Sequence, residues 1–109
     1  MRPLDQLEQT IRERQQAGQA DKSYTARRLA GGIPKIGPKV TEEAAEVVEA
    51  AAEPDEAGRE HTIREAADVV YHLMVLMAAR GVELAEVERE LARRFGMSGL
   101  DEKASRGPN

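Results

Sequence analysis

The chain has 109 residues and a net charge of −4, so we expect a single domain over residues 1–109 with a modest core. Nucleic-acid binders need a basic face, and the acidic balance with 3% aromatic residues argues against a nucleic-acid partner. There is no cysteine, which excludes disulfides and thiol catalysis and fits a reducing cytoplasm. The longest apolar run, Leu73 to Ala79, is far too short to span a bilayer, so no membrane partner is expected.

Apolar periodicity and turn residues predict an all-α, four-helix bundle-like fold. Between Gly31 and Pro38 the chain has three glycines and two prolines, a composition that breaks a helix, and Pro38 suits a first helical turn. A polar turn over residues 53–58 precedes the third helix, and Gly81 followed by Val82 predicts a Schellman-type end for it. The expected helices cover Leu4 to Gln16, Pro38 to about Ala52, the residues after Gly58 to about Arg80, and Leu84 to Phe95.

Carboxylates recur at helical spacing beside apolar residues in the second and third predicted helices. Glu42, Glu43 and Glu46 fall within a sector of about 100° on one helix. Glu65 and Asp68 share a face of the other helix because they are three residues apart. If the two helices pack antiparallel, these carboxylates converge. Unpaired charges in a low-dielectric site are costly, so such a cluster needs cationic partners, protons or a metal ion.

Oxygen ligands without cysteine favour a hard ion such as Mg²⁺ over Zn²⁺. Mg²⁺ binds few carboxylates and completes its shell with water and phosphate oxygens, so a phosphate-bearing substrate is the natural partner. Two plainer interpretations stay open. Glu-rich helices are mostly solvated faces, and Thr62 followed by Glu65 matches a capping box, which would make Glu65 a helix-start residue.

Three hydroxyl residues, Ser23, Tyr24 and Thr25, lie next to several cations. Ser23 or Thr25 fits the N-cap of a short helix. Hydroxyl donors and cations also suit a loop that faces phosphate. Lys39 either screens the glutamates, contacts phosphate or is simply solvated. The simpler interpretation of His72 is a core histidine that is hydrogen-bonded to a carboxylate, and the alternative is a residue that contacts substrate.

The carboxylate pattern, Glu42-Glu43-x-x-Glu46 with Glu65-x-x-Asp68, resembles the signature of the all-α nucleoside triphosphate pyrophosphatases, the MazG-like superfamily. More specifically, the chain resembles the phosphoribosyl-ATP pyrophosphatase family of histidine biosynthesis from about residue 7 to residue 106. The glycine- and proline-rich segment 31–38 departs from the family pattern. The resemblance rests on Ser23-Tyr24-Thr25, on Lys39 to Val47, on Glu65 to Leu73, and on the tail Glu102-Lys103-Ala104-Ser105-Arg106.

The resemblance implies Mg²⁺-dependent hydrolysis of phosphoribosyl-ATP to phosphoribosyl-AMP and pyrophosphate in the cytoplasm. The metal ligands would be Glu43, Glu46, Glu65 and Asp68, while Glu42 or another carboxylate would orient or deprotonate the attacking water. We expect residues 97–109 to form a tail. The substrate-binding candidates are Ser23, Tyr24, Thr25, Lys39, His72, Lys103 and Arg106.

A homodimer is expected, because so short a chain can hardly bury the apolar stripes of both the third and fourth helices, and the resemblance implies the same. Two other functions remain open. A housekeeping pyrophosphatase acting on ordinary or damaged nucleoside triphosphates would use the same metal chemistry. A non-catalytic helical interaction domain with a solvated acidic face is the more distant alternative.

Overall fold

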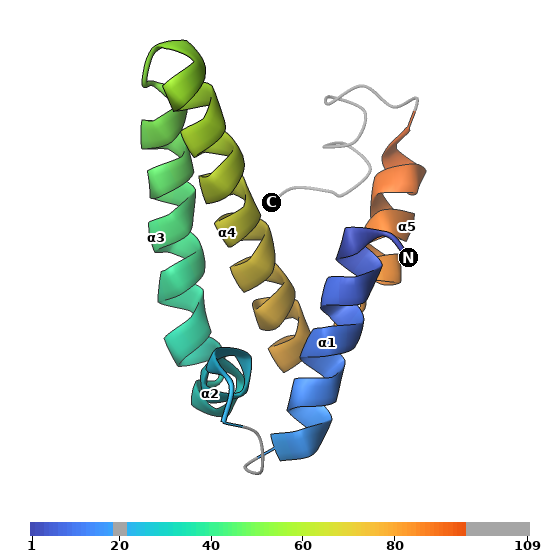
Figure 1. Ribbon diagram of the computed structural model, residues 1–109. Coiled ribbons are helices and arrows are strands. Elements are labelled where there is room, and N and C mark those ends of the chain that lie inside the picture. Colours follow the sequence, from blue (N-terminus) through green and yellow to red (C-terminus); the bar gives the residue numbers. More distant parts are fainter. Residues whose placement is uncertain (19–21, 96–109) are drawn as a thin grey trace, which may run out of the picture.

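The computed structural model describes residues 1–18 and 22–95, which form five α-helices and no strand (Figure 1). Helices α3 and α4 lie side by side as a long antiparallel hairpin, α1 and α5 form a second arm, and α2 lies near the point where the arms meet (Figure 1). The all-α prediction is confirmed, with α2 as a short helix beside the four longer ones. The helices are α1 (Pro3–Ala17), α2 (Tyr24–Gly31), α3 (Ile33–Ala51), α4 (Asp55–Arg80) and α5 (Leu84–Arg94).

The hydrophobic core lies where the two arms meet. Ile11 of α1, Ile36 of α3 and Val75 of α4 are fully buried there, and Met74 and Leu84 pack in the same cluster. Burial of each such side chain contributes about 1.5–3 kcal/mol. This core therefore anchors the end of the α3–α4 hairpin nearest α2, whereas the other end of the hairpin extends away from α1 and α5 (Figure 1).

Helix α3 begins at Ile33, so the predicted start at Pro38 is wrong. Pro34 lies in the first turn, where a backbone N–H has no partner within the helix and a proline is tolerated. The N–H of Ile36 already bonds to the Gly32 carbonyl at 3.0 Å. Pro38 lies inside the helix and removes one backbone hydrogen bond, a cost that the complete burial of Ile36 offsets.

The start of α4 also differs from the prediction. The helix begins at Asp55, about one turn early, so Thr62 lies inside it and donates its hydroxyl to the Gly58 carbonyl at 2.8 Å. The alternative in which Thr62 and Glu65 form a capping box is therefore wrong. Glu65 lies well within α4 and has no helix-start role.

The predicted Schellman end of α4 is confirmed. Gly81 has φ 77°, its N–H bonds to the Ala78 carbonyl at 3.1 Å, and the Val82 N–H bonds to the Met77 carbonyl at 2.8 Å. Helix α5 ends at Arg94, within one residue of its predicted end. In the part of the chain that the structure describes, no helix is both long enough and apolar enough to cross a membrane.

Gly58 allows the turn between α3 and α4 to close tightly against α4. The residue is buried, and a Cβ atom built on it would overlap the backbone carbonyl of Glu53. Only glycine permits so close an approach of the two backbones. The turn therefore holds Glu53 against the beginning of α4.

This contact predicts that Gly58→Ala lowers the free energy of unfolding by about 1–3 kcal/mol, the usual cost of overpacking. Gly37→Ala is the matched control, because a Cβ atom there would have no neighbour within 4 Å among the described residues. We expect the control to change stability by no more than about 1 kcal/mol, the difference in helix propensity. Urea unfolding of the two variants measures both values, and equal stability of the two would contradict the close contact at Gly58.

Candidate functional site

Three glutamates from the two hairpin helices converge on one small volume. Glu43 and Glu46 come from α3 and Glu65 comes from α4, and one carboxylate oxygen of each lies within 4.8 Å of the others. The spacing of three residues places Glu43 and Glu46 on the same face of α3. Antiparallel pairing of the helices then brings Glu65 to that face. We call these three residues the glutamate cluster.

The glutamate cluster carries negative charge that no described lysine or arginine neutralises. Glu43 is only 8% exposed, and its burial, a hydrogen bond with Glu46 and nearby carboxylates raise the pKa of Glu43 to about 7. The Oε2 atoms of Glu43 and Glu65 are buried and have no hydrogen-bond partner. Within residues 1–18 and 22–95, no lysine or arginine pairs with any of the three side chains. Such a group of carboxylates is stabilised by a proton or by a metal ion.

The other two predicted carboxylates lie at the margin of the glutamate cluster. Asp68 is exposed and outside the group of three, but its charge contributes to the raised pKa of Glu43. Glu42 is also exposed, and its Oε2 lies 3.5 Å from the Nζ of Lys39. Lys39 therefore pairs with Glu42 at the margin and not with a member of the glutamate cluster.

His72 connects α2 with α4. The ring is buried, and its Nδ1 lies 3.1 Å from the backbone carbonyl oxygen of Asp68. Because a carbonyl only accepts, Nδ1 carries a proton, and the Tyr24 hydroxyl lies 3.1 Å from Nε2 on the other side of the ring. The nearest oxygen of Glu43 is 4.0 Å from Nδ1, too far for a hydrogen bond. The interpretation of His72 as bonded to a carboxylate is therefore wrong.

The first turn of α2 is held in place by the hydroxyl residues that the sequence singled out. The Ser23 side chain accepts a hydrogen bond from a backbone N–H of this turn at 3.1 Å, so the N-cap prediction is confirmed. The hydroxyl of Thr25 bonds to that of Tyr71 on α4. The guanidinium of Arg28 lies over the Tyr24 ring, 4.6 Å from its centroid. These contacts place α2 directly beside His72.

His61 is a polar neighbour of the glutamate cluster that the sequence analysis missed. Its Nε2 lies 3.2 Å from Glu65 Oε1 and its Nδ1 lies 3.0 Å from Glu53 Oε1. The hydrogen bond to Glu53 and, to a smaller extent, the contact with Glu65 raise the pKa of His61. The spacing of four residues between His61 and Glu65 is the sequence signal that would have found it. Lys103 and Arg106 lie outside the described residues.

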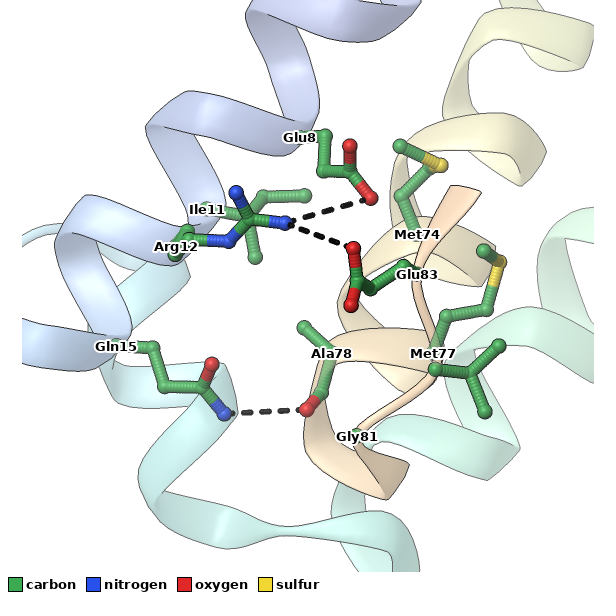
Figure 2. Close-up of a pocket in the computed structure, with 10 residues that line it drawn as sticks. Glu8, Ile11, Arg12, Gln15, Met74, Met77, Ala78, Gly81 and Glu83 are labelled. Atoms are coloured by element: carbon green, nitrogen blue, oxygen red, sulfur yellow. Dashed lines mark hydrogen bonds and ion pairs between the residues drawn. The ribbon is translucent and has the colours of Figure 1, made fainter. Parts of the chain in front are cut away.

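A hollow lies away from the glutamate cluster, between α1 and the C-terminal end of α4 (Figure 2). Its volume is about 280 Å³, and Met74 and Met77 are among the side chains that line it. Arg12 extends between Glu8 and Glu83 on one side of the hollow, with N–O distances of 3.8 and 3.9 Å. None of the three clustered glutamates lines this hollow, so the hollow is not part of the candidate metal site.

The raised pKa of Glu43 predicts that the metal-free protein becomes less stable as the pH rises. The pKa of Glu43 in the folded state is about 7, whereas the ordinary pKa of a glutamate side chain is 4.5, so the folded state holds this proton to a higher pH. The free energy of unfolding therefore falls between about pH 5 and pH 8, by roughly 1–3 kcal/mol. Urea unfolding in a buffer that contains a chelator measures this slope.

Glu43→Gln is the matched variant, because it replaces the carboxyl group with a neutral group of the same shape. We expect it to be more stable than the wild type near the alkaline end of this range, and to depend less on pH. The raised pKa of His61 acts in the same direction, since its stabilising charge is lost as the pH rises, so some slope remains. An unchanged slope in Glu43→Gln would show that another group titrates here.

Comparisons with known proteins show the family to which this chain belongs. Residues 4–95 match the family model described as Phosphoribosyl-ATP pyrophosphohydrolase. The chain is 60% identical to the phosphoribosyl-ATP pyrophosphatase of Rhodopirellula baltica over 95% of this chain and 86% of the relative. It is 50% identical to that of Erythrobacter litoralis over 98% and 99%, and 52% identical to that of Rhizorhabdus wittichii over 94% and 93%. The chain therefore belongs to the phosphoribosyl-ATP pyrophosphohydrolase family.

Proposed function

We propose that this chain hydrolyses phosphoribosyl-ATP to phosphoribosyl-AMP and pyrophosphate, a step of histidine biosynthesis, in the cytoplasm. The observation that carries the proposal is the glutamate cluster, which lies within the region that matches the family. The relatives named above are called phosphoribosyl-ATP pyrophosphatase, and their names supply the substrate. The carboxylates of the cluster can bind a cation that in turn binds phosphate oxygens.

Mg²⁺ is the proposed cofactor. The buried and unpartnered oxygens of Glu43 and Glu65 fit a hard cation, and Glu46 supplies a third oxygen. Asp68 would complete the ligand set from the exposed margin of the cluster. When bound, the ion neutralises negative charge that develops on the pyrophosphate leaving group. Glu43 must release its proton for binding, because ligating carboxylates are ionised.

Glu42 is the proposed residue for activating water. It lies outside the group of three glutamates, so it need not be a metal ligand, and its exposure allows water to reach it. Such a carboxylate can orient or deprotonate the attacking water. Lys39, whose Nζ lies 3.5 Å from Glu42 Oε2, is the proposed contact for the phosphate chain.

Helix α2 is the proposed contact surface for the rest of the nucleotide. The Tyr24 hydroxyl of α2 lies 3.1 Å from His72 Nε2, and the Nδ1 of the same ring lies 4.0 Å from Glu43. A single side chain therefore separates α2 from the glutamate cluster. A substrate whose phosphates reach the glutamate cluster would pass this surface. The proposed contacts are Ser23, Tyr24, Thr25 and His72, together with Lys103 and Arg106 from the tail.

We also propose that the enzyme is a homodimer. Helix α4 exposes Ile63 and Val70, which lie away from Glu65 around the helix, and α5 exposes Val87 and Leu91 one turn apart. These apolar side chains are 37–55% exposed. A second copy of the chain would bury them, and most soluble oligomers consist of identical chains.

The substrate proposal predicts Mg²⁺-dependent release of pyrophosphate from phosphoribosyl-ATP. The assay compares phosphoribosyl-ATP with ATP and dUTP, first with Mg²⁺ and then with a chelator. Release from phosphoribosyl-ATP alone, abolished by the chelator, is the expected result. Release from ATP or dUTP instead would assign the housekeeping activity, and no release from any of them would favour the interaction domain.

Asp68→Asn is the matched variant in this assay. Because Asp68 is exposed, the substitution should leave the fold intact while removing a charged ligand. We expect turnover of phosphoribosyl-ATP to be lost and the far-ultraviolet circular dichroism to be unchanged. Normal turnover in this variant would remove Asp68 from the ligand set.

The homodimer proposal predicts that Val70→Asp shifts the protein from dimer to monomer, because a charge cannot be buried at an apolar interface without cost. Light scattering coupled to gel filtration measures the mass. Arg59→Ala on the same helix is the control, since Arg59 pairs with Glu56 at an exposed site. A monomeric wild type, or a Val70→Asp variant that stays dimeric, would refute this interface.

A further inference from the structure

His61 links the turn after α3 to the glutamate cluster. Its ring lies between two carboxylates, with Nδ1 3.0 Å from Glu53 Oε1 and Nε2 3.2 Å from Glu65 Oε1. The side chains become more buried along this series, from 48% exposed at Glu53 to 35% at His61 and 17% at Glu65. The histidine therefore connects a surface residue with a member of the cluster.

The contact with His61 makes the two oxygens of Glu65 different. Oε1 is engaged by the imidazole, whereas Oε2 is buried and has no partner in the described structure. A carboxylate held through one oxygen loses the freedom to rotate about its last side-chain bond. Glu65 is thereby left with one buried oxygen in a fixed direction.

The other end of this series is also fixed. Glu53 follows α3, and its backbone carbonyl packs against Gly58 so closely that a Cβ atom would not fit. Both oxygens of Glu53 lie within 3.1 Å of the His61 Nδ1. Thus Glu53 holds the imidazole, and the imidazole holds Glu65.

We propose that His61 is a positioning residue that fixes Glu65 with Oε2 turned to the metal ion, and that Glu53 fixes His61 in turn. This inference rests on the proposed Mg²⁺ site. Groups that orient a ligating side chain commonly change metal affinity by roughly 10- to 100-fold when they are removed. His61 acts through Glu65 and needs no contact with substrate.

The test is titration of the metal-free protein with Mg²⁺ in a calorimeter, which requires no turnover. His61→Gln keeps an amide donor near the position of Nε2 and preserves the bond to Glu65. His61→Asn keeps a donor near Nδ1 and preserves only the bond to Glu53. We expect His61→Asn and His61→Ala to weaken Mg²⁺ binding by roughly 10- to 100-fold, and His61→Gln to bind close to the wild type.

Arg59→Ala is the control for charge and helix stability. It removes a cation from the same turn of α4, and its partner Glu56 is not in the glutamate cluster. We expect its Mg²⁺ affinity to equal that of the wild type. Urea unfolding of each metal-free variant identifies any variant that fails to fold. If His61→Ala fails to fold, the comparison of His61→Gln with His61→Asn still tests the positioning role of His61.

The outcomes separate this inference from the proposed function. If the wild type binds Mg²⁺ and all His61 variants bind it equally well, His61 has no positioning role although the metal site stands. The same conclusion follows if His61→Gln and His61→Asn weaken binding to the same extent. If the wild type binds no Mg²⁺, the metal site and the role of His61 are both refuted.

Discussion

Repulsion among three carboxylates, one of them buried and two half-buried, is the constraint on which the rest of this structure depends. Glu43, Glu46 and Glu65 share a volume small enough for one ion, and the described residues offer them no lysine or arginine. Without metal, the protein meets this cost by keeping a proton on Glu43, whose pKa rises to about 7. The arrangement therefore costs stability in the metal-free protein, and the cation that we propose would restore it on binding.

The fold separates the part that supplies stability from the part that holds charge. Ile11, Ile36 and Val75 form the core at one end of the α3–α4 hairpin, while the glutamate cluster lies on the hairpin itself. Two long helices in direct contact can hold repelling groups together because their backbone hydrogen bonds are satisfied within each helix. This separation also leaves apolar faces of α4 and α5 uncovered, which is the physical reason for proposing a second copy.

Two different contacts reach the hairpin from outside the cluster. From α2, the Tyr24 hydroxyl meets the buried ring of His72, which is fixed by a backbone carbonyl of α4. From the turn after α3, Glu53 holds His61 against Glu65. In our proposals, the first contact marks the side on which the nucleotide would lie, and the second orients a carboxylate that would bind the metal ion. Both depend on side chains that belong to different segments of the chain.

The sequence by itself determined the all-α class, the Schellman end of α4 and the convergence of carboxylates from two helices. These features follow from spacings of three or four residues and from local turn chemistry, which do not depend on distant parts of the chain. The family followed from the same residues. The approach of Glu43, Glu46 and Glu65 needed only the further assumption that neighbouring helices pack antiparallel.

Only the tertiary structure decided where α3 begins and which partners the histidines have outside α4. Pro38 breaks a helix by composition, yet the burial of Ile36 against other helices outweighs one lost hydrogen bond. Likewise, no local pattern shows that Glu53 reaches His61, because their contact depends on how closely the turn packs at Gly58. Helical spacing places side chains on a face, but the choice of partner across helices is set by packing.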